Sequence, residues 1–130
     1  MDRRKRTRGQ SLVEFALCLP VLMMLMLGIF DLGRAFNAYI VITNAAREGA
    51  YFGSLYPHDT SGISAQVISE AQGSGIPLTA DDIAISTTAA NGTPISVTVT
   101  YDFSFLTTYV FGGPPLTLQG RAEMMIVMDI

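Results

Sequence analysis

Cysteine and histidine are scarce in this sequence. Its 130 residues include one cysteine, Cys18, and one histidine, His58. A single cysteine cannot form an intramolecular disulfide or supply the cysteine pairs of a zinc site. A serine–histidine–aspartate arrangement would depend on His58, which stands in a polar turn, and no nucleophile-elbow motif is present. The adjacent carboxylates Asp81 and Asp82 are typical of a solvated turn rather than a calcium loop. We therefore predict a protein that is not an enzyme, with no catalytic residue, no metal and no cofactor.

Basic residues are almost confined to the first eight positions. Residues 1–8 carry five bases and one acid, whereas residues 9–130 carry three bases and ten acids. The formal charges of the two parts are thus about +4 and −7, which sum to the net charge of −3. A nucleic-acid-binding surface needs clustered bases to neutralise phosphates, and the body of this chain has none. Nucleic acid is therefore excluded as a partner.

A long and strongly hydrophobic stretch follows this basic start. Residues 12–30 contain one charged side chain, Glu14. As a helix, these residues would rise about 28 Å at roughly 1.5 Å per residue, close to the roughly 30 Å of a hydrocarbon core. Bases before the stretch and none directly after it place the amino terminus in the cytoplasm by the positive-inside rule. We predict a single-pass protein of the cytoplasmic (inner) membrane, with the rest of the chain outside the cytoplasm.

Two other interpretations of the apolar stretch are open. A secretory signal peptide also combines a basic start with an apolar run, but this run is long for one and no clean small-x-small cleavage site follows it. A buried core helix of a soluble protein would need apolar cover on every side, which a chain of this size can hardly provide. A membrane anchor explains the stretch better than either.

Beyond Phe30 the pattern becomes amphipathic without a helix breaker. Arg34, Asn37, Asn44 and Glu48 fall on the polar side. Apolar and small residues recur at spacings of three and four on the other side: Leu32, Ala35, Phe36, Tyr39, Ile42, Ala46, Gly49 and Ala50. Asp31 and Arg34 are spaced to pair on the helix surface. One long helix over about residues 11–54 is predicted, ended by Tyr56-Pro57.

The remaining residues favour a short helix and a small sheet. A helix is predicted around residues 64–71, and the period then falls to two. Strands are predicted over residues 83–87, 95–103 and 116–126, with a turn at Asn91-Gly92 between the first two. Aromatic residues are expected mostly in the sheet core, some of them at a subunit contact: Tyr101, Phe103, Phe105, Tyr109 and Phe111. The apolar face of the sheet needs a cover, and the amphipathic part of the long helix is the candidate. The predicted fold class is α+β, with the long helix packed on an antiparallel sheet of three to four strands.

Three segments resemble a known family. Gly9-Gln10-Ser11-Leu12-Val13-Glu14-Phe15 is similar to the processing motif of type IV prepilins and pseudopilins. Together with residues 28–36 and 43–50, it resembles the TadE-like proteins of tight-adherence (Flp-type) pilus systems. The closing run over residues 97–118 is also similar. The resemblance implies a pilin-like fold and a non-enzymatic structural subunit of pilus or secretion assembly. Its implied partners are the membrane, other pilin or pseudopilin subunits, the assembly platform and a prepilin peptidase, with a homo-oligomer as a further option.

The resemblance also implies a cleavage site and a role for the acidic residue. A membrane peptidase of such systems is expected to cut between Gly9 and Gln10, although Gln10 stands where many type IV pilins carry phenylalanine. The cut would remove five bases and expose an amine on Gln10, four residues before Glu14 and on the same helix face. Our hypothesis is that Glu14 directs docking into an assembly by pairing with its own amine or that of a neighbour. The simpler alternative is that Glu14 only reaches the nearby headgroups.

These interpretations divide the chain into three parts and leave alternative functions open. Residues 1–9 are a basic cytoplasmic leader, residues 10–54 are the long helix with a membrane segment over about 12–30, and residues 55–130 are an extracytoplasmic α+β domain. The chain could instead be the main filament-forming pilin, and a cell-surface location after processing is compatible with either role. A membrane-tethered binding module is the alternative from another class. A tether should tolerate exchange of its helix for an unrelated apolar one, whereas a pilin should not.

Overall fold

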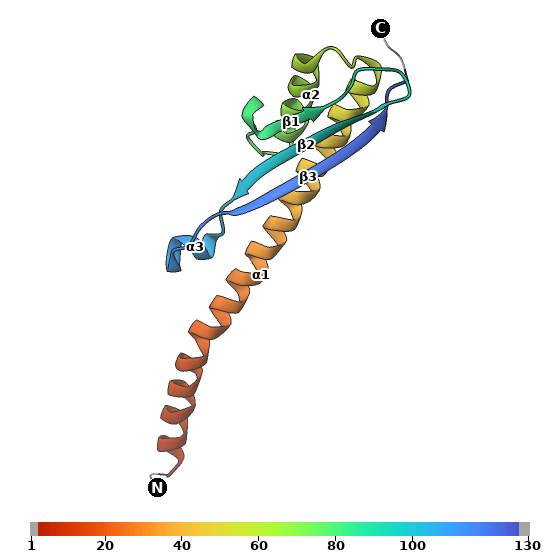
Figure 1. The fold of residues 1–130 in the computed structure, drawn as a ribbon. Coiled ribbons are helices and arrows are strands. Elements are labelled where there is room, and N and C mark those ends of the chain that lie inside the picture. Colours follow the sequence, from red (N-terminus) through yellow and green to blue (C-terminus); the bar gives the residue numbers. More distant parts are fainter. Residues whose placement is uncertain (1–2, 128–130) are drawn as a thin grey trace.

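One helix forms the axis of the molecule. The computed structural model describes residues 3–127, with side chains from Gly9 onward, and the final residues of the predicted domain lie outside that range. Helix α1 spans Arg3–Leu55 and continues through Pro20. Figure 1 shows its first half projecting alone, while all other elements gather around its second half. The predicted end of the long helix is confirmed to within one residue, and the helical backbone begins earlier than predicted.

The chain reverses direction after α1 and forms a second helix. Helix α2 spans Thr60–Gly73, so it starts before the predicted position. Its first turn is held by Asp59, whose Oδ1 accepts hydrogen bonds from the Gly62 amide at 2.8 Å and the Ser61 hydroxyl at 2.9 Å. An aspartate at this position satisfies an amide that has no partner within the helix. This cap explains the earlier start of α2.

Three antiparallel strands form a sheet in the order β1-β2-β3. After a short 3-10 turn, η1 (Ala80–Asp82), they are β1 (Ile83–Ser86), β2 (Pro94–Phe103) and β3 (Leu116–Met125). The three predicted strands and the predicted fold class are confirmed. The turn at Asn91-Gly92 is present, with Gly92 at a φ of 76° and the Thr93 amide bonded to the Ala90 carbonyl at 3.1 Å. The connection between β1 and β2 is longer than a two-residue hairpin loop.

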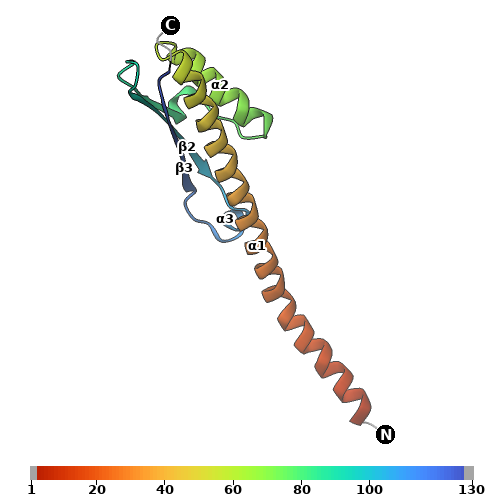
Figure 2. The same cartoon turned by 90° about the vertical axis from the view of Figure 1, so that its right-hand side faces the viewer.

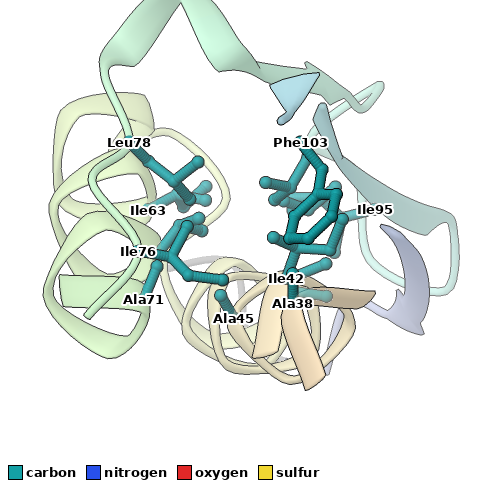
Figure 3. Packing of buried hydrophobic residues seen from close by; sticks show 14 of the residues in the cluster. Ala38, Ile42, Ala45, Ile63, Ala71, Ile76, Leu78, Ile95 and Phe103 are labelled. Carbon is teal, nitrogen blue, oxygen red and sulfur yellow. The ribbon is translucent and has the colours of Figure 1, made fainter. Parts of the chain in front are cut away.

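The hydrophobic core lies between the sheet and the two helices. Figure 3 shows side chains of α2 and of the connection to β1 on one side, facing β2 across the core, with α1 beneath both. Six large aliphatic side chains are fully buried and come from the sheet and both helices: Ile42, Ile63, Val67, Ile95, Val97 and Val99. The alternation predicted for β2 is confirmed in part, because Ile95, Val97, Val99 and Phe103 are buried, whereas Tyr101 is only partly buried and Ser96 is buried as well. As predicted, the second half of α1 covers the sheet.

The face that α1 turns to the sheet is made of small residues, which corrects part of the prediction. Ala35, Ile42, Ala46, Gly49 and Ala50 are buried as predicted. Leu32, Phe36 and Tyr39 were assigned to the same face but are exposed, whereas Ala38, Ala45 and Gly53 are buried. The cause is a close approach of the backbones that bulky side chains would prevent.

Gly120 on β3 shows how close this approach is. A Cβ atom at Gly120 would lie 2.9 Å from the Thr43 amide nitrogen and 3.0 Å from the Ile42 carbonyl carbon. Such distances leave no room for a side chain between β3 and α1. The large residues of α1 therefore remain on its flank, outside the core.

A short helix that the sequence did not predict lies between β2 and β3. Helix α3 spans Leu106–Phe111, and Gly112-Gly113-Pro114-Pro115 connects it to β3. Figures 1 and 2 show α3 at the lower end of the sheet, beside the middle of α1. Of the aromatic residues expected mostly in the sheet core, Phe103 is buried and Phe105 is partly buried, but Tyr109 and Phe111 are exposed on α3. These last two are therefore not core residues.

Candidate membrane and assembly site

The first half of α1 is apolar and uncovered. Every side chain from Leu12 to Phe30 is exposed or, at Leu27, partly exposed. Residues 9–55 contain a window long and apolar enough to cross a membrane, and none of that window is buried within the molecule. A core helix of a soluble protein would be covered by other elements, so this alternative does not fit. One amino-terminal apolar helix indicates a single-pass membrane protein.

The predicted processing and assembly residues lie at the start of this uncovered half. Gly9, Gln10 and Glu14 are all exposed on α1, and a Cβ atom at Gly9 would meet nothing within 4 Å among the described residues. The Gln10 side-chain amide donates a hydrogen bond to Glu14 Oε1 at 3.3 Å. Gln10 and Glu14 therefore share one helix face, as their spacing predicts. Within residues 9–127 Glu14 has no ion-pair partner.

A second carboxylate of α1, Asp31, lies where the uncovered half meets the domain. It is only 2% exposed. Its Oδ1 accepts hydrogen bonds from the Leu106 amide at 2.8 Å and from Arg34 Nη1 at 3.1 Å. Its Oδ2 accepts them from the Thr107 amide at 2.8 Å and the Thr107 hydroxyl at 3.0 Å. Asp31 thus caps the first turn of α3 from a residue far away in the sequence.

The bonds to Asp31 decide its protonation. Burial of the carboxylate raises the pKa of Asp31, but the hydrogen bonds from the Thr107 and Leu106 amides, the Thr107 hydroxyl and Arg34 outweigh burial and hold the pKa below its ordinary value. Hydrogen bonds to the ionised form favour that form. Asp31 is therefore a carboxylate at neutral pH.

The ion pair between Asp31 and Arg34 was predicted as a surface pair, and only the pairing is confirmed. Asp31 is buried, while the Arg34 side chain is 40% exposed. The Arg34 guanidinium also lies 5.0 Å from the centre of the Phe103 ring, in cation–π range. Phe103 packs edge-to-face on Phe105, with ring centres 5.1 Å apart. These contacts connect α1, the end of β2 and the start of α3.

Sequence reasoning missed the role of Asp31 because its partners are remote. The spacing to Arg34 was visible, but nothing local indicates that Leu106 and Thr107 approach the same carboxylate. One available signal was the position of an acid directly after a membrane-length apolar run, where an unsatisfied charge is costly.

The polar residues considered for catalysis or metal binding are not brought together. His58 is exposed in the turn before α2. Asp82 accepts hydrogen bonds from the Thr79 amide at 2.8 Å and the Thr79 hydroxyl at 2.9 Å, as part of the turn that precedes β1. Over residues 3–127, no group of three metal-binding side chains is found. Cys18 is exposed on the apolar half of α1.

Comparison with protein families identifies the same segment that the motifs marked. A family model described as TadE-like protein matches residues 9–50. The resemblance to the TadE-like proteins of tight-adherence pilus systems is thereby confirmed over this segment, and it indicates involvement in pilus assembly. That family is structural rather than typically enzymatic. The match ends before the domain, so the similarity noted over residues 97–118 stays a prediction. No curated protein and no solved structure gives a match.

Proposed function

Because residues 9–50 form a TadE-like segment, we propose that this chain is a non-enzymatic pseudopilin or minor pilin. It acts as a structural subunit in the assembly of a tight-adherence pilus or a related secretion apparatus. The observation that carries the proposal is Glu14, an acid inside an uncovered, membrane-length helix, five residues after Gly9. A charged side chain costs roughly 2.5–3.5 kcal/mol at the centre of a membrane helix on insertion scales, and an acid within such a helix is by default a functional-site hypothesis.

In this proposal the chain is anchored in the cytoplasmic membrane with its amino terminus inside. Residues 1–9 form the cytoplasmic leader, residues 12–30 cross the bilayer within the helix of residues 10–54, and residues 55–130 lie outside. The leader's bases hold it to the anionic inner leaflet at about 1 kcal/mol for each base near the surface. These bases lie before Gly9, where the described side chains begin.

A prepilin peptidase removes this leader by hydrolysis of the Gly9–Gln10 peptide bond. One water molecule is consumed, Gly9 leaves with a new carboxylate, and Gln10 gains a free α-amino group. Glycine weakens a helix interior by roughly 0.5–1 kcal/mol relative to alanine, so α1 is locally easiest to open at Gly9. The absence of tertiary contacts there supports access to the bond.

The new amine then provides the cation that Glu14 needs. Gln10 already contacts Glu14 on one helix face. Pairing with the amine of a neighbouring subunit would set the register between adjacent helices, since a mispaired carboxylate in lipid is costly. An apolar flank of α1 supports further helix contacts, because Leu32, Phe36, Tyr39 and Ile40 are each at least 47% exposed.

Two measurements test the proposal. Intact mass and amino-terminal sequence of the protein in membrane and sheared surface fractions should show a mature chain that begins at Gln10. Glu14→Gln should still be cleaved but should fall at least tenfold in the assembled fraction. Glu48→Gln, which changes an exposed acid in the covered half of α1, is the matched control and should assemble normally. Normal assembly of Glu14→Gln would contradict the proposal.

The membrane and sheared surface fractions also distinguish a minor pilin from a main filament subunit and from a membrane-tethered binding module. A main filament subunit would dominate the sheared material, whereas a minor pilin would be a small part of it. A membrane-tethered binding module would stay in the membrane fraction and would keep its function when residues 12–30 are replaced by an unrelated apolar helix.

A further inference from the structure

An uncharged segment in the carboxy-terminal part of the chain lies far from the membrane-length stretch in the sequence and next to it in space. Residues 103–120 contain no aspartate, glutamate, lysine or arginine. Within it, α3 exposes its apolar side chains: Tyr109 is 82% exposed, Val110 66% and Phe111 61%. In a soluble domain, consecutive exposed side chains of this kind are unusual and mark a contact with something else.

The position of α3 indicates what that contact is. Val110 and Phe111 line one apolar hollow together with residues of the membrane half of α1: Met23, Met24, Met26, Leu27 and Phe30. Figures 1 and 2 show α3 beside α1 in both views, at the end of the sheet nearest the projecting half of the helix. The end of α3 therefore lies alongside residues that precede the predicted exit of α1 from the bilayer.

The depth of this overlap can be estimated along α1. From Met23 to Phe30 the helix rises about 10 Å at roughly 1.5 Å per residue. Interfacial helices bury their apolar face about 5–10 Å into the boundary between headgroups and acyl chains. The apolar tip of α3 thus overlaps α1 over the depth that an interfacial helix reaches.

Asp31 makes this position compatible with lipid. Backbone amides without partners are costly in hydrocarbon. The carboxylate of Asp31 accepts the amides of Leu106 and Thr107, at the start of α3 and just beyond the apolar run. At the other end of α3, the Gly112 amide donates to the Thr108 carbonyl at 2.8 Å. Two amides at the start of α3 and one carbonyl near its end are therefore satisfied within the chain.

We propose that α3 is a membrane-surface foot, whose residues Tyr109, Val110 and Phe111 enter the outer leaflet beside α1. Asp31 holds this foot at a fixed height on the membrane helix. A tyrosine beside apolar residues suits the interface, where one part of the ring is in oil and the hydroxyl is near water. The foot gives the domain a second attachment to the bilayer and a defined orientation on it. This inference depends on α1 crossing the membrane but not on the role in pilus assembly.

Two reasons favour lipid, rather than a second copy of the chain, as the contact of the exposed residues of α3. The exposed tip of α3 is continuous with the lipid-facing surface of α1, since both line one hollow. The segment also lacks any charged residue that would fix the orientation of a protein partner. Lipid needs no such orientation, because bilayer association depends on apolar area.

The chain has no tryptophan, so one introduced tryptophan reports on one position. The full-length chain is reconstituted at low protein-to-lipid ratio into phosphatidylethanolamine–phosphatidylglycerol vesicles. Val110→Trp and Phe111→Trp report on the foot, Leu25→Trp on the membrane helix and Tyr51→Trp on the exposed far end of α1. Quenching by acyl-chain-brominated lipid and by aqueous acrylamide is then compared, with circular dichroism to verify folding.

We expect brominated lipid to quench Val110→Trp and Phe111→Trp several-fold more than Tyr51→Trp, with blue-shifted emission. If acrylamide reaches positions 110 and 111 as readily as position 51, while Leu25→Trp is quenched by lipid, the foot is disproved. Blue-shifted emission that brominated lipid does not quench, and that becomes stronger as the protein-to-lipid ratio is raised, would indicate contact with a second copy of the chain. That result would also overturn the proposal. Failure of Leu25→Trp to respond would overturn both the foot and the membrane arrangement. None of these results depends on pilus assembly, so the proposed function is tested separately.

Discussion

The two halves of α1 each carry a carboxylate, and the chain treats the two groups differently. Glu14, in the uncovered half, accepts a hydrogen bond from Gln10 at 3.3 Å. Asp31, where the covered half begins, accepts four hydrogen bonds and is 2% exposed. Asp31 is satisfied within one chain and therefore stabilises the fold. Glu14 lies in the membrane-length apolar segment and has no ion-pair partner among residues 9–127, which suits the proposed role in assembly.

The glycines of α1 follow the same division. A Cβ atom at Gly49 would lie 2.4 Å from Val67 Cγ2, whereas a Cβ atom at Gly28 would meet nothing within 4 Å. The covered half therefore depends on close packing inside the molecule. The uncovered half has no such packing within the described residues and is available for the proposed contacts with lipid or other subunits. This contrast can be tested by making the same change in each half.

The largest effect is expected from leucine at the buried glycine. Gly49→Leu should destabilise the domain by about 3 kcal/mol or more, because the new side chain overpacks the contact with α2. The Tm of the full-length chain in detergent should fall by roughly 12–24 °C at about 4–8 °C per kcal/mol. Gly28→Leu is the control and should leave the Tm of the domain unchanged. Equal effects at both positions would mean that the halves do not differ in packing.

The two carboxylates should separate stability from assembly. Asp31→Asn replaces one acceptor oxygen by an amide that cannot accept, so the two donors bound to that oxygen lose their acceptor, and at least one of them belongs to α3. The Tm should fall by several degrees, and the Leu106 and Thr107 amides should exchange hydrogen faster in mass-spectrometric or NMR measurements. Glu14→Gln should leave both quantities at their wild-type values. A lower Tm for Glu14→Gln would show that Glu14 also has a structural role.

Acid should weaken the domain through two aspartates. The Gly62 amide and the Ser61 hydroxyl lower the pKa of Asp59, and the pKa of Asp31 is also lowered, in both cases from an ordinary value of 3.8. A depressed pKa contributes stability that is fully present above the unfolded-state value and is lost as pH falls through the lower folded-state value. The Tm should therefore decline below about pH 4.

A matched variant assigns part of this acid effect. The Tm difference between the wild-type chain and Asp31→Asn should be constant above pH 5 and should shrink as the pH falls below 3.8. Above pH 5 the carboxylate of Asp31 is ionised in both the folded and the unfolded chain. A difference that stays constant into strong acid would rule out protonation of Asp31 as a cause.

The smallest effect is expected from Thr107→Val, which removes only the hydroxyl bond to Asp31. The amides of Leu106 and Thr107 and the Arg34 guanidinium still reach the carboxylate. The Tm should fall by a degree or two, clearly less than for Asp31→Asn. Thr43→Val is a control on α1, since its hydroxyl bonds only to the Tyr39 carbonyl of its own helix at 2.8 Å. A larger fall in Tm for Thr107→Val than for Asp31→Asn would contradict the conclusion that the carboxylate is held by several hydrogen bonds and not by the Thr107 hydroxyl alone.

Local patterns predicted the elements well where periodicity is strong. The long helix was predicted to its end near Leu55 and the strands to within a few residues, because alternation and the breaker at Pro57 are local signals. The apolar face of α1 was predicted less well. Periodicity identifies an apolar side of the helix, but small residues form the buried part of it, and Leu32, Phe36 and Tyr39 are exposed. Which part of an apolar side is buried depends on how closely the sheet approaches.

Helix α3 and its cap could not be predicted from local patterns. Six residues give too short a period to recognise, and the capping acceptor is Asp31 rather than a residue at the start of α3. Asp59 caps α2 from the adjacent position and is recognisable by sequence spacing. The distinction is one of distance along the chain, because local capping follows from neighbouring residues and remote capping follows only from the fold.

The order of residues alone established the charge asymmetry, the membrane-length apolar run with Glu14, and the motif that begins at Gly9. Each of these is a property of consecutive residues and of their hydrophobicity or charge. Folding in three dimensions selected the small-residue face of α1 and joined Asp31 to α3, placing Val110 and Phe111 beside the membrane helix. These features depend on contacts between residues some 75 positions apart, and such contacts form only when the sheet has packed on α1.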